Sequence, residues 1–440
     1  MTSASSDSKK TDVGSYFISN YPPYSQWTTD QLPEVRSALE SVSPLKTPLG
    51  LYLHIPFCRK RCKFCYFKVF TDVKAAEVQR YVDALCSEIS LVSQLPVMGD
   101  RPFRFVYFGG GTPSFLSPKQ LTKLADQLRK HITWDGAEEV TFECEPGTLS
   151  ETKVKTLRNE LGVTRLSLGV ENFSDDLLEL NGRAHLSKEV HKSWKWIEEA
   201  DFPNVNIDLI SGMVGESWDN WRENVVKTLE LSPESVTIYQ MELPFNTVFS
   251  KDILGNQTES KVADWETKRA WVDYAFEQFK DAGYSVSSAY TVVKDPQKVN
   301  FSYRDNLWKG ADLLATGIAS FGHANGVHYQ NLADLTQYLT AIEEGQQLPL
   351  GRGFVPSDHQ RLVREMILLL KRGYLDASYF REKFGVEIKD LFAEQWNDIV
   401  KNDNATIEGD SIRLTSKGLL SVDGLLSAFF EPQFQGVRYT

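Results

Sequence analysis

LYLHIPFCRKRCKFCYF, from Leu51 to Phe67, decides both the fold and the chemistry of this chain. Its first five residues are apolar and β-branched, which predicts a short buried strand that ends at Pro56. A basic loop follows and holds three of the chain's five cysteines in the spacing C-x3-C-x2-C: Cys58, Cys62 and Cys65. Thiolates are soft ligands that suit iron–sulfur clusters. Three of them can hold three irons of a [4Fe–4S] cluster and leave the fourth iron open to another ligand.

Two other uses of these cysteines fit less well. A structural zinc site takes four ligands, usually as two closely spaced pairs, and only His54 is a nearby fourth candidate. A disulfide framework is not expected, because five cysteines in 440 residues is an intracellular pattern. The lone Cys86 and Cys144 are expected to be small core residues.

The cysteine spacing resembles the cluster motif of radical S-adenosylmethionine (SAM) enzymes. The wider string LYLHIPFC is similar to the oxygen-independent coproporphyrinogen III oxidase family, which includes radical SAM haem chaperones and class C methyltransferases. The resemblance covers residues 45 to 430. It implies a partial (β/α)6-type barrel, a [4Fe–4S] cluster on the three cysteines, and one or two bound SAM molecules.

The composition indicates which classes of binding partner to expect. The formal net charge of −11 argues against nucleic acid. The cations Arg59, Lys60, Arg61 and Lys63 form a local basic cluster, which either attracts an anionic cofactor or substrate or is a solvated loop. No apolar run reaches membrane-spanning length and the N-terminus lacks the apolar core of a secretory signal, so a cytoplasmic protein without a membrane partner is expected.

Strands and helices are predicted to alternate along most of the chain, which favours an α/β fold with parallel strands. The predicted strands are 51–55, 103–108, 139–143, 165–170, 204–210, 235–241 and, last, 284–289. The predicted helices are 31–42, 75–95, one opened by Ser117 and Pro118, 150–161, 175–181, 187–200, 217–231 and 264–282. Six or seven such units suggest a partial barrel rather than a flat sheet.

Three regions are expected. Residues 1–45 form an N-terminal extension, with residues 1–12 disordered and an aromatic segment at 16–27 that is either a lid or packs on the barrel exterior. Residues 46–340 form the barrel. Residues 341–440 form a small, mostly helical, winged-helix-like domain, with helices 359–371, 376–384, 388–401 and 419–430 and a hairpin at 405–414. Because the chain is acidic, this domain is expected to cover the barrel rather than to bind DNA.

Candidate SAM-binding residues fall at the C-terminal ends of predicted strands, where the loops of such barrels carry their ligands. Gly109, Gly110 and Gly111 follow the second strand and allow close backbone approach, and Thr112 adds a hydroxyl. Glu143 ends the third strand, where its carboxylate can accept from ribose hydroxyls. In this arrangement the glycine loop suits the amino and carboxylate groups of SAM, and the family's SAM loop looks the same.

The resemblance assigns further SAM contacts. Glu171 ends the fourth strand at a place where most of the family has Gln, and Glu can accept hydrogen bonds but cannot donate one unless it is protonated. Arg183 can pair bidentately with a carboxylate. His185 is either a ligand-side group or a satisfied core residue. The remaining residues that match family contact positions are Tyr52, Phe64, Asp208, Met241 and, toward a second SAM, Phe321.

The resemblance implies that one electron from the cluster cleaves SAM to methionine and a 5′-deoxyadenosyl radical, which then abstracts hydrogen from the substrate. An electron-donor protein such as a flavodoxin or ferredoxin is the implied partner, and no protein side chain is assigned as catalytic. Three hypotheses stay open: a coproporphyrinogen dehydrogenase-like oxidoreductase acting on a tetrapyrrole or other flat aromatic substrate, a methyltransferase using two SAM molecules, and a haem chaperone. The oxidases usually carry a further cysteine two residues after the third, and Phe67 stands there in this chain.

Overall fold

The computed structural model describes residues 19–44, 46–243, 247–249 and 262–437. The expected disordered segment 1–12 lies outside these residues. The chain divides into two compact units: unit 1 comprises Met1–Gln26 and Pro356–Thr440, and unit 2 comprises Trp27–Val355. Residues 341–355, which we expected in the C-terminal domain, are therefore part of unit 2.

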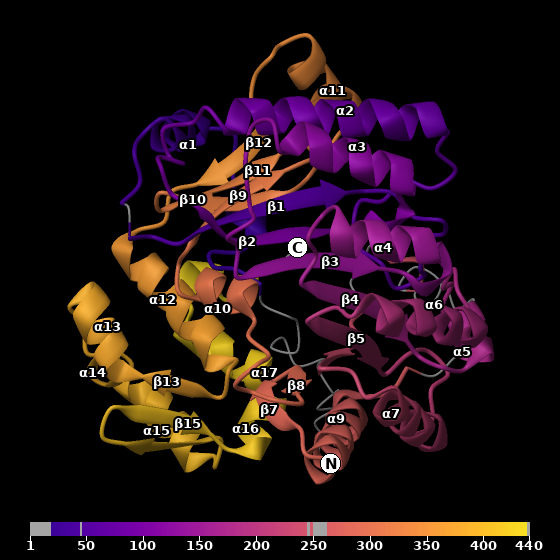
Figure 1. Ribbon diagram of the computed structural model, residues 1–440. Helices are drawn as coiled ribbons and strands as arrows, with labels where there is room; N and C mark the ends of the chain where they lie inside the picture. The colour runs from indigo at the N-terminus through magenta and orange to yellow at the C-terminus, as the bar shows by residue number, and fades with distance from the viewer. Residues whose placement is uncertain (1–18, 45, 244–246, 250–261, 438–440) are drawn as a thin grey trace, which may run out of the picture. The chain divides into compact units, whose positions relative to one another are not determined.

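Twelve strands in the described part of unit 2 form one sheet, in the order β12-β11-β10-β9-β1-β2-β3-β4-β5-β6-β8-β7 (Figure 1). Its six central strands follow chain order and pair in parallel. They are β1 (Leu49–Ile55), β2 (Phe103–Gly110), β3 (Glu139–Cys144), β4 (Arg165–Glu171), β5 (Asn204–Ser211) and β6 (Ser235–Gln240). Each was predicted to within two residues of its ends, and the predicted α/β fold is confirmed.

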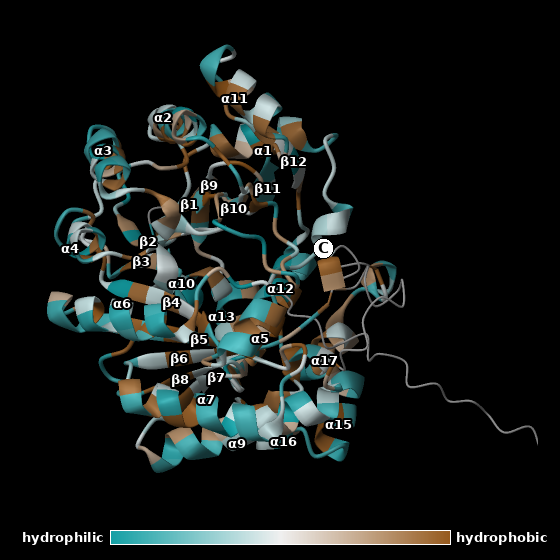
Figure 2. Ribbon diagram, turned by 90° about the vertical axis from the view of Figure 1, so that its right-hand side faces the viewer, coloured by the Kyte–Doolittle hydropathy of each residue, from teal (hydrophilic) through white to brown (hydrophobic). Residues whose placement is uncertain are grey.

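Helices connect the parallel strands and pack beside one another on one side of the sheet (Figure 1). They are α2 (Ala75–Val92), α3 (Pro118–Leu128), α4 (Glu151–Asn159), α5 (Asp175–Leu180), α6 (Ser187–Ala200), α7 (Trp218–Leu231) and α9 (Trp265–Asp281). The predicted apolar face of α2 is buried, including Val78, Leu85 and Ile89. Figure 2 shows the resulting bands of hydrophilic and hydrophobic residues along these helices. Side-chain caps start several of them, such as Ser117, whose hydroxyl accepts from the Gln120 N–H.

The sheet extends further than the sequence predicts. The strand predicted at 284–289 is β7 (Ser285–Ser288), but it forms an antiparallel hairpin with β8 (Thr291–Val293), which pairs antiparallel with β6. On the other side β9 (Asp312–Thr316) lies parallel to β1. After β9 come three antiparallel strands: β10 (Phe321–Ala324), β11 (Val327–Asn331) and β12 (Leu350–Phe354). These strands are short and follow no long crossover helix, so the βα alternation does not reveal them.

Two further helices lie in unit 2 beside this extension. They are α1 (Leu32–Leu39), predicted at 31–42, and α11 (Leu335–Glu343), while α10 (Ser302–Trp308) packs against β2. Helix α1 contacts β11 and β12, and α11 contacts α2. No described helix of either unit is both long and apolar enough to traverse a lipid bilayer.

Unit 1 combines short helices with a three-stranded sheet, in the order β13-β15-β14. Its helices are α12 (Asp358–Leu370), α13 (Ala377–Phe384), α14 (Ile388–Leu391), α15 (Ala393–Lys401), α16 (Ser416–Leu420) and α17 (Val422–Leu426). The predicted hairpin is β14 (Ala405–Glu408) with β15 (Ser411–Leu414), and β13 (Tyr374–Asp376) adds the third strand. The helices predicted at 388–401 and 419–430 are each interrupted, the first at Phe392.

The aromatic segment at 16–27 is divided between the units, with residues 16–18 outside the described part. Tyr21 is fully buried in unit 1, where its ring meets Phe430 at 5.0 Å and Phe434 at 5.6 Å. Trp27 belongs to unit 2 and stacks on His328 of β11 at 5.2 Å. Tyr21 therefore packs within unit 1, on residues from the C-terminal part of the chain.

Candidate active site

The cysteine loop, Pro56–Thr71, leaves the C-terminal end of β1 and is closed at its base. Phe57 and Phe70 form a parallel bridge, in which the Cys58 N–H donates to the Phe70 carbonyl over 3.0 Å. The Phe57 ring is buried and lies edge-on to Tyr81 of α2. Farther along, the Lys63 N–H donates to the Asn181 carbonyl over 3.0 Å. The loop is therefore anchored to the sheet and helix layer by contacts that involve no metal.

The three cysteines of this loop are free thiols and half-buried. Two donors reach their sulfur atoms: the Thr112 hydroxyl lies 3.4 Å from Cys58 Sγ, and Arg183 Nη1 lies 3.4 Å from Cys62 Sγ. Burial raises the pKa of Cys58 to about 11 and also raises the pKa of Cys65. Iron binding would therefore displace protons, as metal binding to cysteine does generally.

The geometry favours a cluster over a single ion. Among the described residues, no three His, Cys, Asp or Glu side chains gather around one metal position. A mononuclear zinc site requires such convergence. In a [4Fe–4S] cluster each cysteine binds a separate iron, so three cysteines spread along one loop fit it. The donors from Thr112 and Arg183 are the kind of outer contacts that orient and tune thiolate ligands.

The glycine loop after β2 approaches the cysteine loop closely. Gly110 has φ +118°, and a Cβ there would lie 2.7 Å from the His54 ring. A Cβ on Gly111 would lie 3.0 Å from Cys58 Sγ and 2.9 Å from the Pro56 carbonyl carbon. Only glycine fits both positions without displacing the His54 ring at Gly110, or the Pro56 backbone and a cluster cysteine at Gly111. The sequence-predicted Gly110, Gly111 and Thr112 are thus brought against the three-cysteine motif.

Three half-buried carboxyl groups end or nearly end successive strands of the sheet: Glu143 on β3, Glu171 on β4 and Asp208 on β5. Glu143 accepts from the Tyr107 hydroxyl over 2.7 Å and from the Gly110 N–H over 3.1 Å. Asp208 accepts from the Ser167 hydroxyl over 2.8 Å and from Asn206 Nδ2 over 2.9 Å.

Burial is the main cause of raised pKa values in this set. It raises the pKa of Glu143 and of Glu171 to about 7 and that of Asp208 to about 6. The charge of Asp208 raises the values of the other two further. A cationic ligand next to these groups would offset their mutual repulsion. The three carboxyls therefore suit a cationic ligand.

Arg183 connects these strands to the cysteine loop. Its Nη2 donates to the Gly169 carbonyl over 2.8 Å and lies 3.6 Å from Glu171 Oε1, while Nη1 reaches Cys62. Its Nε is buried without a hydrogen-bond partner among the described residues. Glu171 itself has φ +65°, an uncommon conformation for a non-glycine residue. Such strain at a strand end is typical of functional sites.

The apolar and aromatic candidates lie in three separate places. Met241 is buried in a cluster with Ile210, Met213, Val214 and Phe249, and Phe64 of the cysteine loop packs against the same cluster. Tyr52 on β1 stacks on Tyr107 at 5.9 Å, and its hydroxyl lies 3.2 Å from His54 Nδ1. Phe321 begins β10, two strands from β1, and its ring contacts Trp27.

The sequence reasoning missed several polar residues on the same face of the sheet. Tyr107, Ser167 and Asn206 hold the candidate carboxyls directly. Tyr107 stands two positions before Gly109 and Asn206 two before Asp208, while Ser167 stands four before Glu171. Residues i and i+2 share one face of a strand. That alternation is the signal that could have identified them. The ring of Tyr303 on α10 adds an aromatic surface 4.4 Å from Tyr107.

Two histidines near the site have different surroundings. His185 is buried in the core, with Nε2 3.1 Å from the Val170 carbonyl; its Nδ1 lies 3.2 Å from Glu145 Oε1 but has no hydrogen-bond partner among the described residues. Burial lowers the pKa of His54 to about 4. His54 lies beside Gly110, and its Nε2 has no hydrogen-bond partner in the described part of the chain.

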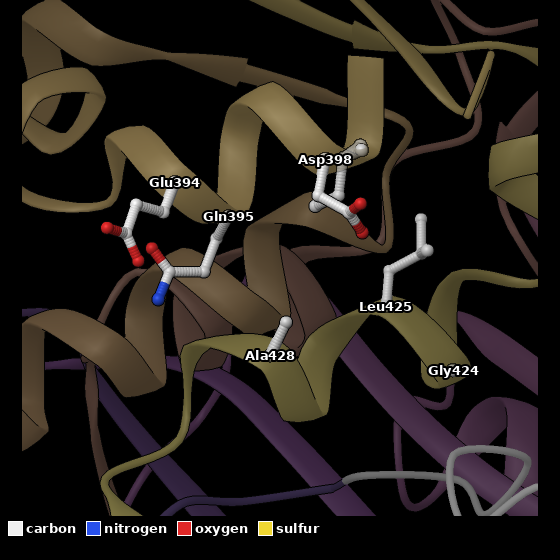
Figure 3. Close-up of a pocket in the computed structure, with 7 residues that line it drawn as sticks. Glu394, Gln395, Asp398, Gly424, Leu425 and Ala428 are labelled. Carbon is white, nitrogen blue, oxygen red and sulfur yellow. The ribbon is translucent and has the colours of Figure 1, made fainter. Parts of the chain in front are cut away.

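A hollow within unit 1 lacks the thiol and histidine ligands of the cysteine loop region. It has a volume of about 350 Å³ and lies between α15 and the segment that follows α17. Figure 3 shows Glu394, Gln395 and Asp398 on one helix, facing Leu425 and Ala428. Neither carboxyl has a neighbouring cysteine or histidine among the lining residues, so this hollow does not rival the cysteine loop as a site.

Comparison with known proteins bears on this geometry. The model of the radical SAM superfamily matches residues 52–226, which include the cysteine loop, the glycine loop and the strand-end carboxyls. Residues 52–226 form a radical SAM domain. This domain implies a [4Fe–4S] cluster and SAM as cofactors, and the half-buried thiols with their two donors fit that cluster.

Sequence similarity to other proteins extends well beyond residues 52–226. It is 29% identical to the heme chaperone HemW of Lactococcus lactis, over 85% of this chain and 95% of that protein. It is 25% identical to the oxygen-independent coproporphyrinogen III oxidase of Synechocystis, over 93% of this chain and 91% of that protein. The fold is similar to that of coproporphyrinogen III oxidase from Escherichia coli, with a TM-score of 0.79, 22% identity, and coverage of 94% and 96% of the two chains.

Proposed function

We propose that this protein is a radical SAM enzyme that binds SAM between the cysteine loop and the ends of β2 to β5, and that its substrate is a tetrapyrrole. The observation that carries the proposal is the convergence of Cys58, Cys62, Gly111, Thr112 and Arg183 through direct sulfur contacts. These residues lie up to 125 positions apart in the chain. Their meeting at the thiols is what a shared cluster and SAM site requires.

The cysteines Cys58, Cys62 and Cys65 would hold the cluster through three irons. When bound, the reduced cluster supplies the electron that cleaves SAM to methionine and a 5′-deoxyadenosyl radical. Gly110 and Gly111 would let the backbone approach SAM, and Thr112 would hold Cys58 Sγ in place. Burial of this region in the sheet would exclude water from the radical.

The charged residues would orient SAM. Glu143, Glu171 and Asp208 provide negative charge once they ionise, which suits the cationic groups of SAM. The buried Arg183 Nε needs an acceptor, which the SAM carboxylate would supply. Phe64 and Met241 share an apolar cluster against which the adenine could pack. We propose that Tyr52 completes this SAM site and that Phe321 serves a second SAM, if one is bound.

The tetrapyrrole substrate is inferred from the relatives, whose names include heme and coproporphyrinogen. Tyr52, Tyr107 and Tyr303 form contiguous aromatic surfaces beside the carboxyls, which suits a flat ligand. With such a substrate the deoxyadenosyl radical would abstract one hydrogen atom, and loss of CO2 with transfer of one electron to an external acceptor would complete an oxidative decarboxylation. Methyl transfer with a second SAM is the variant that S-adenosylhomocysteine would reveal.

Haem chaperoning is the second candidate, and a specific residue favours it. Phe67 occupies the place where the oxidases usually carry a further cysteine. Its side chain is 48% exposed and packs on Tyr66 at 4.5 Å. An exposed aromatic pair beside the cluster can stack on a haem plane, and the similarity to heme chaperone HemW points the same way.

One anaerobic experiment separates these functions. The reconstituted, dithionite-reduced protein is incubated with SAM, with and without coproporphyrinogen III and haem, and with Cys62→Ala as control. Deoxyadenosine that rises with coproporphyrinogen, together with loss of carboxyl groups, supports the oxidase. S-adenosylhomocysteine supports the methyltransferase, and stable haem absorbance without substrate-dependent deoxyadenosine supports the chaperone. An intact cluster that yields none of these products contradicts the tetrapyrrole assignment.

A further inference from the structure

The cluster site needs an electron from outside the chain. Only five cysteines occur in the sequence, and the two outside the motif, Cys86 and Cys144, are single residues in separate elements. A second iron–sulfur cluster that could relay electrons therefore has no cysteine ligand set. The electron must reach the cysteine loop across the surface next to it.

A surface hollow of about 510 Å³ opens beside this loop. Its lining residues are Arg59, Lys60, Glu179, Arg183, Ala184, His185 and Leu186. One of them, Arg183, has a side chain only 12% exposed and donates to Cys62 Sγ over 3.4 Å. The hollow is thus separated from a cluster cysteine by a single side chain, so a protein seated there would lie next to the cluster.

Charge distinguishes this surface from the rest of the molecule. The chain has a net charge of −11, yet the 16 residues of the cysteine loop include five Lys or Arg and no Asp or Glu. Arg59, Lys60 and Arg61 are exposed in succession. An acidic protein is repelled by the chain as a whole and attracted at this patch, which orients it on encounter.

The cations of this patch have unequal roles. Arg59 is tied down: its Nη1 donates to the Gly147 carbonyl over 2.7 Å, and its Nε lies 3.5 Å from Glu145. Arg61 Nη2 donates to the Cys65 carbonyl over 3.1 Å. Lys60 has no hydrogen bond or ion pair with any described residue and is exposed. Glu179 is the one carboxylate among the described residues that line the hollow.

We propose that this hollow and its basic wall are the docking site of an acidic one-electron carrier protein, with Lys60 as the principal attractive charge and Glu179 as an opposing one. The proposal rests on the proposed cluster function. The donor, for example a flavodoxin, would pass one electron to the oxidised cluster. Its anionic flavin hydroquinone becomes the neutral semiquinone without loss of a proton, and no bond in this chain forms or breaks.

Charge variants test this docking site in opposite directions. Binding of a bacterial flavodoxin to the cluster-loaded protein is measured anaerobically by calorimetry, without SAM. At low salt, Lys60→Glu is expected to raise Kd by about tenfold and Glu179→Lys to lower it by about threefold. Lys298→Glu makes the same charge change at a side chain that is 84% exposed on another loop, and its Kd should stay within about twofold of wild type. Salt should weaken wild-type binding and reduce these differences.

Cluster reduction gives a second readout. Stopped-flow absorbance at the cluster bands follows reduction by flavodoxin hydroquinone, and Lys60→Gln, which only removes charge, accompanies Lys60→Glu in case the reversal disturbs the loop. Both Lys60 variants should be reduced more slowly by flavodoxin than Lys298→Glu, with unchanged iron content. Equal Kd values and rates for Lys60→Glu and Lys298→Glu would overturn the proposal, as would wild-type protein that binds no flavodoxin.

The docking site and the proposed enzyme activity can be contradicted by different results. Protein that cleaves SAM with dithionite but does not bind flavodoxin keeps the proposed function and loses the docking site. Protein that binds flavodoxin in a Lys60-dependent way but cleaves no SAM with dithionite keeps the docking site and loses the proposed enzyme activity.

Discussion

At the scale of single residues, Arg183 connects the cysteine loop to the sheet. Its guanidinium reaches Cys62 Sγ, the Gly169 carbonyl and the Glu171 carboxyl from one position. The planar fork of Arg can satisfy several acceptors that the single ammonium group of Lys cannot. The side chain therefore couples cluster placement to the end of β4.

We predict that Arg183→Lys retains the charge but loses this coupling. Loss of an outer contact to a metal ligand typically costs about 10- to 100-fold in metal affinity or activity. The variant should release iron faster when challenged with a chelator and should bind SAM more weakly. Arg222→Lys, at an exposed position on α7, is the matched control and should behave as wild type. Iron release from Arg183→Lys at the wild-type rate would contradict the role of this side chain.

SAM binding should depend on pH through the strand-end carboxyls. Their raised pKa values, about 7 for Glu143 and Glu171 and about 6 for Asp208, mean that they gain protons as pH falls from 8 to 6. A cationic ligand favours the ionised form of the carboxyls, so SAM binding should release protons. The affinity for SAM should therefore decrease as the pH is lowered from 8 to 6. Calorimetry at pH 6, 7 and 8 measures this slope.

The variant Glu143→Gln should bind SAM more weakly at pH 8 and show a flatter pH dependence. Glu151→Gln removes an exposed carboxyl on α4 and should leave the slope unchanged. An affinity for SAM that does not change between pH 6 and 8 would show that these carboxyls do not face its cationic groups.

At the scale of elements, Glu88 joins α2 to the turn between β9 and β10. Its carboxyl is buried and accepts from the Gly317 N–H over 2.7 Å, from Tyr338 over 2.6 Å and from Asn331 Nδ2 over 2.6 Å. Gly317 has φ +90° and lies against the His54 carbonyl, with no room for a Cβ. Glu88 therefore holds the edge of the extended sheet against β1.

This carboxyl should make stability depend on pH. Burial raises its pKa from 4.5 to about 7, so the folded state binds the proton more tightly than the unfolded state. Its favourable contribution is complete below pH 4.5 and is lost as pH rises through 7, at about 1.4 kcal/mol per pKa unit. Glu88→Gln, which cannot ionise, should flatten the dependence of unfolding free energy on pH in this window.

The variant Glu88→Ala should be destabilised at every pH, because three buried donors lose their acceptor, each at a cost of about 1–3 kcal/mol. Asp83→Asn, an exposed position on the same helix, should change stability by less than about 1 kcal/mol. Urea unfolding followed by tryptophan fluorescence between pH 5 and 8 measures all three variants. Identical slopes for wild type and Glu88→Gln would contradict the assignment.

At the scale of the whole molecule, residues 19–26 fold together with residues 356–437 in unit 1. The Tyr21 hydroxyl donates to Glu431 Oε2 over 3.2 Å and accepts from the Glu431 N–H over 3.0 Å. Arg364 Nε donates to Asn20 Oδ1 over 2.6 Å. All cysteine-loop and strand-end site residues belong to unit 2.

We predict that Tyr21→Ala destabilises unit 1 without loss of cluster binding. Removing a fully buried aromatic ring typically costs about 3–5 kcal/mol. Hydrogen exchange should increase in peptides from residues 356–437, while iron content stays at the wild-type level. Tyr374→Ala, a tyrosine of the same unit that is 39% exposed, is the control and should change exchange little. Loss of iron from Tyr21→Ala would show that the units are not independent in this respect.

The sequence by itself determined the parallel strands, most helices and the set of candidate residues at the strand ends. These follow from local patterns: the periodicity of 2 or 3.6 residues, caps such as Ser117, and the C-x3-C-x2-C spacing. Only the tertiary structure decided that β8 to β12 extend the sheet, that Arg183 reaches Cys62, and that His185 is buried beside Glu145. The reason is physical. Short edge strands and contacts between residues over a hundred positions apart depend on how whole elements pack, and no local pattern records that packing.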